Sequence, residues 1–146
     1  MKDKKTRPSI IEAFNAAIQG IIYTFKYERN MKIHYIIAVA VLIISLRFDL
    51  NKFEMMILIL SISLVIISEM FNTAIENTVD LVTDKYHYLA KIAKDVAAGG
   101  VLISALNAVA VGYLIFYDKF TDLSKSLIFT IRKSDPHVTL ICIVLV

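Results

Sequence analysis

The sequence contains very few of the residues that interrupt helices or cross-link a chain. Its 146 residues include four glycines, two prolines and one cysteine. Because helix-breaking residues are so scarce, we expect long and rarely interrupted helices. The lone cysteine, Cys142, excludes an internal disulfide and any metal site built from cysteine thiolates, and we expect it to be an inert apolar residue.

Hydrophobic residues make up 58% of the chain, which is too apolar for an ordinary soluble domain and indicates a membrane protein. Three runs lack acidic residues, lysine and arginine: Ile33 to Leu46, Met55 to Ser68 and Val96 to Tyr117. At about 1.5 Å per residue, only the last run can cross a hydrocarbon core of roughly 30 Å by itself. Basic residues that snorkel at their ends extend the first two. We therefore predict transmembrane helices over residues 31–48, 52–82 and 89–117.

A helix of a different kind is predicted over residues 9–28. Ser9 and Glu12 form an S-x-x-E capping box, and apolar residues then recur on one helical face. This pattern is typical of a helix that lies in the membrane interface, and it fits a helix of a soluble bundle less well beside such apolar runs. Asn51 and Glu54 repeat the cap before the helix predicted at 52–82. The predicted fold is an all-α integral membrane protein.

The distribution of lysine and arginine predicts the orientation in the membrane. Residues 1–32 carry seven of them, the turn 47–53 carries two, and the segment 83–94 carries three. We therefore place the N-terminus and the 83–94 segment on the cytoplasmic side of the membrane. Four basic residues after Tyr117 oppose this assignment. We interpret the basic N-terminus as a contact with anionic lipid headgroups, and we expect no nucleic-acid partner.

The stretch SEMFNTAIENTVD, residues 68–80, places acidic and amide groups at the end of an apolar run. On a helix, Glu69, Asn72, Glu76 and Asp80 fall within an arc of roughly 80° and form a stripe about 16 Å long. Ionisable groups at membrane depth are costly and indicate function. A solvated helix end is the alternative, and it suits Asp80 better than Glu69. A carboxylate at the apolar boundary suits a general base, and hard oxygen ligands suit Mg²⁺.

Two further polar clusters lie on the same predicted side of the membrane. In KYHYLAKIAKD, residues 85–95, Lys94 could neutralise phosphate, or it could simply snorkel beside a helix-start Asp95. In FKYERNMKIH, residues 25–34, Glu28 is an acid among bases and could form a surface salt bridge instead. His34 could contact a lipid headgroup or be an ordinary interfacial histidine.

The motif E-x-x-N-T-A-I-E-x-x-x-D, from Glu69 to Asp80, resembles the signature of the bacterial integral-membrane diacylglycerol kinase and undecaprenol kinase family. YHYLAKIAKD resembles the second motif of that family, and the similarity extends over residues 8–118. The family is unrelated to soluble kinases, and the chain lacks a P-loop and a G-x-G-x-x-G motif. The resemblance implies a homotrimer with active sites between subunits, and ATP- and Mg²⁺-dependent phosphorylation of a lipid alcohol.

The resemblance also implies roles for individual residues. Glu69 resembles the general base, and Glu28 and Glu76 resemble the carboxylates that bind metal and ATP. The implied nucleotide contacts are Lys85, Tyr86, His87, Lys94 and Asp95. Asn72 and Asp80 resemble supporting polar residues, and His34 and Ala98 are expected to contact the lipid substrate.

The identity of the lipid acceptor depends on smaller features. ERNMKIH, with His34, resembles the undecaprenol-kinase branch, whereas diacylglycerol remains the alternative acceptor. Ser9 stands where the diacylglycerol-using branch tends to carry arginine. Residues 1–118 are predicted to form the kinase domain. Residues 119–146 are an extension that resembles the start of a truncated phosphatidic-acid-phosphatase-like segment, from which we infer no phosphatase activity.

Two other classes of function compete with a kinase. A transporter could use the acidic stripe as a relay, but it would place carboxylates at the midplane of several helices. A membrane scaffold would bind no nucleotide, and Glu69→Gln would have no effect on it.

Overall fold

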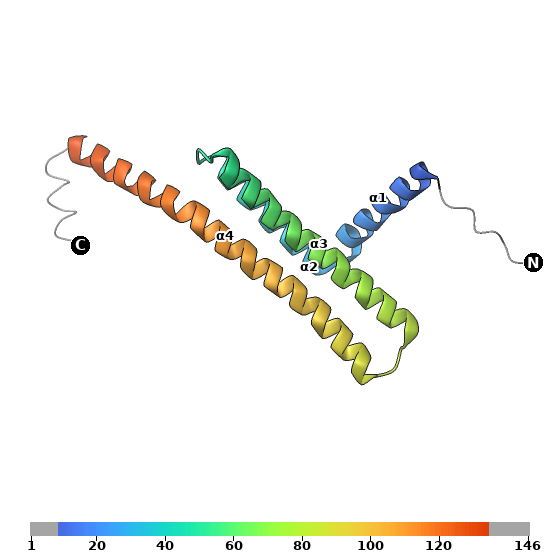
Figure 1. The fold of residues 1–146 in the computed structure, drawn as a ribbon. Coiled ribbons are helices and arrows are strands. Elements are labelled where there is room, and N and C mark those ends of the chain that lie inside the picture. The colour runs from blue at the N-terminus through green and yellow to red at the C-terminus, as the bar shows by residue number, and fades with distance from the viewer. Residues whose placement is uncertain (1–8, 135–146) are drawn as a thin grey trace, which may run out of the picture.

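The computed structural model describes residues 9–134, and this part of the chain is helical apart from short connections. It forms α1 (Ile10–Tyr27), α2 (Arg29–Ser45), α3 (Lys52–Val82) and α4 (Tyr88–Ser134) (Figure 1). The prediction of an all-α fold is thereby confirmed. Residues 135–146, the end of the predicted C-terminal extension, lie outside the described part.

Both predicted capping boxes are present and fix where two helices begin. At α1, the Ser9 hydroxyl accepts a hydrogen bond from the Glu12 amide at 3.2 Å, and the Glu12 carboxylate accepts one from the Ser9 amide at 2.7 Å. At α3, Asn51 and Glu54 exchange the same bonds at 3.0 and 2.7 Å. Each box satisfies two amides that the first turn of a helix leaves unpaired.

Helix α4 is much longer than the predicted 89–117 span, because it continues without a break to Ser134. Its 47 residues correspond to a length of about 70 Å. No glycine or proline lies between Gly112 and Ser134 to end it. The extended part also has a tertiary partner, since Lys119 donates to the Asp49 carbonyl at 2.9 Å and pairs with Glu54 at 3.3 Å.

The turn between α2 and α3 is held against α4 by aromatic packing as well. The Phe48 ring lies edge-on to the rings of Phe116 and Phe120, with centroids 5.6 and 5.0 Å apart. Phe48 therefore belongs to this turn, and α2 ends at Ser45 rather than at the predicted residue 48. The turn and the extended α4 are one packed unit.

Helices α3 and α4 run side by side in opposite directions, α2 packs along α3, and α1 projects at an angle from the other three (Figure 1). The buried apolar core is small and lies where α2, α3 and α4 meet: Met31, Ala38, Leu58, Val65, Val101 and Ile115. Most large apolar side chains are exposed on the single chain. Such a surface fits surroundings of lipid or of other subunits better than water.

Two of the described helices, α3 and α4 over Tyr88–Ser126, are long and apolar enough to cross a membrane. Helix α2 has 17 residues, short of the about 20 that a span ordinarily needs. The span predicted at residues 31–48 therefore depends on snorkelling by Lys32, in the first turn of α2, and by Arg47, just after its end.

Candidate active site

The acidic stripe of α3 begins with a deeply buried carboxylate. Glu69 is 2% exposed, and Asn72 and Thr73 are buried beside it. One oxygen on each of these side chains, Oε2 of Glu69, Oδ1 of Asn72 and Oγ1 of Thr73, has no hydrogen-bond partner among the described residues. Buried oxygens without partners cost stability, so three of them within about one turn of a helix indicate a site that receives a ligand.

Glu69 lies at a cavity of about 230 Å³ between α2, α3 and α4. Its lining consists of Asn30, His34, Glu69, Asn72, Ala98, Val101, Leu102 and Ala105. The structure thus brings together the predicted base and both residues predicted to contact the lipid, His34 and Ala98. Asn30 was missed by the sequence prediction, although it lies four residues before His34 on the same face of α2.

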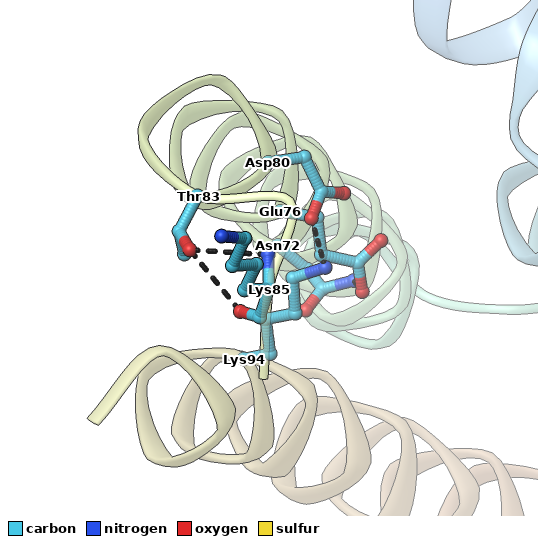
Figure 2. Close-up of polar contacts among 6 residues, drawn as sticks. All are labelled: Asn72, Glu76, Asp80, Thr83, Lys85 and Lys94. Carbon is cyan, nitrogen blue, oxygen red and sulfur yellow. Dashed lines mark hydrogen bonds and ion pairs between the residues drawn. The ribbon is translucent and has the colours of Figure 1, made fainter. Parts of the chain in front are cut away.

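The middle of the stripe is tied to the buried end by a hydrogen bond. Asn72 Nδ2 donates to Glu76 Oε1 at 2.9 Å, and Figure 2 shows these side chains along one face of α3. Glu28 is half-buried at the junction where α1 ends and α2 begins. Glu69 lies within electrostatic reach of Glu28, Glu76 and His34. Three acidic groups from two parts of the chain therefore converge on one region.

A second pocket, of about 440 Å³, lies at the connection between α3 and α4. It is lined by Val79, Asp80, Thr83, Asp84, Lys85, Tyr86, His87, Ala90, Lys91, Lys94 and Asp95. The five predicted nucleotide contacts of the 85–95 segment all line this pocket, whereas Glu28 and Glu76 do not. Asp84 and Lys91 were missed, although the four-residue spacing of Lys91 and Asp95 is a signal for an ion pair.

The lysines of this second pocket are held by carboxylates. Lys94 Nζ lies 2.5 Å from Asp80 Oδ1, and the two side chains reach toward one another from α4 and α3 (Figure 2). Lys91 pairs with Asp95 at 2.5 Å. Both pairs are partly solvated, so they stabilise the fold by little, and either ammonium group can exchange its carboxylate for a phosphate.

The connection itself is ordered by Thr83, which ends α3. Its hydroxyl accepts a hydrogen bond from the Lys85 amide at 3.2 Å and donates one to the Lys85 carbonyl at 3.1 Å (Figure 2). This local turn places Lys85, Tyr86 and His87 at the rim of the second pocket.

The available donors suit a hard cation that is shared with phosphate. Among residues 9–134, no cluster of three or more His, Cys, Asp or Glu side chains gathers as a self-sufficient metal site. Mg²⁺ commonly binds one or two protein carboxylates and completes its shell with phosphate oxygens and water. Glu28, Glu76 and the unpaired Oδ1 of Asn72 are hard oxygen donors of this type.

The two cavities are close neighbours along the helices. Ala98 lines the first and Lys94 lines the second, and they are four residues apart on α4, about 6 Å along its axis. A buried carboxylate at a cavity between apolar helices thus lies next to a lysine-lined pocket, an arrangement that suits a membrane-embedded lipid kinase. The chain belongs to the family described as prokaryotic diacylglycerol kinase, whose sequence model matches residues 15–116.

Characterised relatives are similar over most of the chain. The undecaprenol kinase of Bacillus subtilis is 46% identical over 108 residues, which cover 74% of this chain and 88% of the relative. A diacylglycerol kinase of Synechocystis is 44% identical, covering 72% of this chain and 61% of the relative. The diacylglycerol kinase of Escherichia coli K12 is 29% identical, covering 76% and 91%. The chain is therefore a lipid kinase.

Proposed function

We propose that this lipid kinase transfers the γ-phosphoryl group of ATP to the hydroxyl of undecaprenol. The observation that carries the proposal is the buried Glu69, which has an oxygen without a hydrogen-bond partner and lines a cavity between membrane-type helices. The high similarity to an undecaprenol kinase over 88% of that relative supports this acceptor. Diacylglycerol is the second candidate, supported by the 44% identical relative from Synechocystis.

In the proposed reaction, the lipid hydroxyl enters the Glu69 cavity from the bilayer. The Glu69 carboxylate removes the hydroxyl proton while the lipid oxygen attacks the γ-phosphorus. The bond from that phosphorus to the β,γ-bridging oxygen breaks, and ADP leaves through the second pocket. Lys94 exchanges Asp80 for phosphate and offsets the negative charge that builds up on the transferred group.

Other residues position the two substrates. Lys85, Tyr86, His87 and Asp95 surround the nucleotide in the second pocket, and His34 and Ala98 contact the lipid near its hydroxyl. Glu28 and Glu76 would hold Mg²⁺, and the bound cation would offset the negative charge of the phosphates. Asn72 keeps Glu76 in place through its hydrogen bond, and Asp80 holds Lys94 ready.

The proposed setting is a bacterial plasma membrane that α2, α3 and α4 cross, with α1 in the cytoplasmic interface. The N-terminus and the α3–α4 connection face the cytoplasm, where ATP is available, in agreement with the basic residues of both segments. We also propose a homotrimer, which the family resemblance implies. The many exposed apolar side chains of the single chain support close neighbours in the membrane.

The test measures phosphate transfer from ATP in detergent micelles with Mg²⁺, with undecaprenol and diacylglycerol offered separately. Glu69→Gln should lower kcat by at least about a hundredfold, because it removes the proton acceptor but keeps the side-chain shape. Asp122→Asn is the matched control, because Asp122 is an exposed carboxylate of α4 far along the chain from both cavities. Preference for diacylglycerol would show that diacylglycerol, not undecaprenol, is the acceptor. Undiminished transfer by the Glu69→Gln variant would show that Glu69 is not the general base.

A further inference from the structure

A long apolar groove lies next to the Glu69 cavity in the membrane-type part of the bundle. It has a volume of about 380 Å³ and lies between α2, α3 and α4. His34 and Ala105 line both spaces, so the groove and the cavity lie next to one another. Apart from His34, Ser61 and Tyr113, the residues that line the groove are apolar or glycine.

The α4 wall of the groove has mostly small residues at one end and aromatic residues at the other. Ala105, Ala108, Val109 and Gly112 line it in turn, and Tyr113 and Phe116 stand at the far end. From Ala105 to Phe116 the wall is about 16 Å long, roughly the depth of one bilayer leaflet. A space of this length beside the Glu69 carboxylate suits an extended hydrocarbon chain whose hydroxyl lies at Glu69.

Gly112 is the residue of this wall whose identity local structure explains least. Its backbone does not have a positive φ, so the conformation does not require glycine. A Cβ built on Gly112 would meet nothing within 4 Å, so close packing does not require it either. Glycine destabilises a helix relative to alanine. What glycine provides here is open space in the groove.

We propose that Gly112 keeps the groove deep enough for a long isoprenoid chain and thereby selects the acceptor by chain length. The inference rests on the proposed function and adds the determinant of its substrate class. The chain of the acceptor enters at His34, runs along Ala105 and Ala108, and passes Gly112. Because lipid tails surround the protein anyway, selection here comes from the shape that the groove accepts rather than from a general hydrophobic gain.

The experiment compares Gly112→Leu with the unchanged protein on two isoprenoid alcohols, the short farnesol and the long undecaprenol. We expect kcat/KM for undecaprenol to fall by at least about tenfold, because added methylenes in a fitted pocket have effects of that size. Activity on farnesol should stay within about twofold, because we expect its much shorter chain not to extend past Gly112. Gly100→Leu is the matched control, since it makes the same change on α4 at an exposed position where a Cβ also meets nothing within 4 Å.

Equal loss on both alcohols, or no loss on either, would overturn the inference. So would a change in oligomer size caused by Gly112→Leu and not by Gly100→Leu, because the groove would then hold a neighbouring subunit. A second readout does not depend on activity: undecaprenol with a photoreactive group midway along its chain should label the Ala108–Tyr113 segment, and Gly112→Leu should remove that label. Labelling without phosphate transfer would support the groove as a binding site for the isoprenoid chain and reject the proposed function. Transfer without labelling of this segment would reject the groove as that binding site.

Discussion

Burial of Glu69 lowers the stability of the fold, whereas its proposed role as a base requires it to be there. A carboxylate that is 2% exposed and has one unpaired oxygen is expensive to bury. Glu69 nevertheless lines a cavity between α2, α3 and α4. A costly buried group at a cavity is better explained by chemistry than by a contribution to folding.

We therefore expect Glu69→Gln to lower kcat as stated above without destabilising the protein. The neutral amide has nearly the same shape and a smaller desolvation cost, so the free energy of unfolding should stay equal or rise by about 1 kcal/mol. Unfolding by sodium dodecyl sulfate in mixed micelles, followed by circular dichroism, measures it. A clear decrease would mean that Glu69 is a structural residue whose partner lies elsewhere.

At this same scale, helical spacing predicted which residues share a face but not which residues meet across the bundle. Glu69, Asn72 and Glu76 could be placed on one stripe because they belong to a single helix. The pair of Asp80 and Lys94 could not, because it depends on the geometry of the connection that Thr83 and Lys85 form. Asn30 likewise reaches the Glu69 cavity only through the packing of α2 on α3.

Among the helices, the two capping boxes have the same chemistry but different surroundings. The box at Asn51 begins α3, the central helix of the bundle, and its Glu54 also pairs with Lys119 of α4. The box at Ser9 begins α1, which projects from the bundle (Figure 1). Loss of the Asn51 cap should lower the free energy of global unfolding, whereas loss of the Ser9 cap should fray α1 alone.

Asn51→Ala should lower the free energy of unfolding by about 1 kcal/mol, because it removes the acceptor for an amide of the first turn. Ser9→Ala is the control and should leave the main unfolding transition within about 0.5 kcal/mol of its original value. Unfolding in mixed micelles measures both. Equal effects of the two substitutions would show that α1 unfolds together with the bundle.

A polar contact also joins α3 to α4 beside the active site. The hydroxyls of Ser68 and Ser104 lie 2.7 Å apart, and each also lies within hydrogen-bond distance of a carbonyl on its own helix, that of Leu64 or Gly100. Each hydroxyl has one proton, so only one of the two serines can donate across the interface at a time. The coupling should therefore be modest.

A double-mutant cycle with Ser68→Ala and Ser104→Ala should give a coupling energy of about 0.6 kcal/mol, the average for such bonds between membrane helices. The cycle uses the free energies of unfolding of the two single variants, the double variant and the unchanged chain. Additive single effects would show that the serines bond only to their own helices.

The sequence prediction ended the last helix too early, because α4 is longer than its apolar run. The apolar run stops at Tyr117, and the predicted span ends there because hydropathy was the criterion for its end. The helix continues because helix formation needs only the absence of breakers and a partner to pack against, which the α2–α3 turn supplies through Phe48 and Asp49. Hydropathy predicts where lipid surrounds a helix, not where the helix ends.

At the scale of the whole molecule, a polar pocket and an apolar groove lie at different positions along the helix axes. The lysine-lined pocket lies at the α3–α4 connection, and the apolar groove extends away from it toward the α2–α3 turn. A water-soluble nucleotide and a lipid chain can therefore approach Glu69 from opposite directions. This works only if the α3–α4 connection faces the compartment that contains ATP.

The orientation can be tested with single cysteines, because the chain has only Cys142 to remove. In a Cys142→Ser background, Asp84→Cys places a thiol on the α3–α4 connection and Asp49→Cys places one on the α2–α3 turn, both at exposed positions. A membrane-impermeant maleimide added to intact cells should label the second variant and spare the first, and permeabilised cells should label both. The Lys119 contact with residue 49 should survive the change, because it uses the backbone carbonyl. The reverse labelling pattern would place the lysine-lined pocket outside the cell, away from ATP, and the kinase mechanism would then need a different nucleotide site.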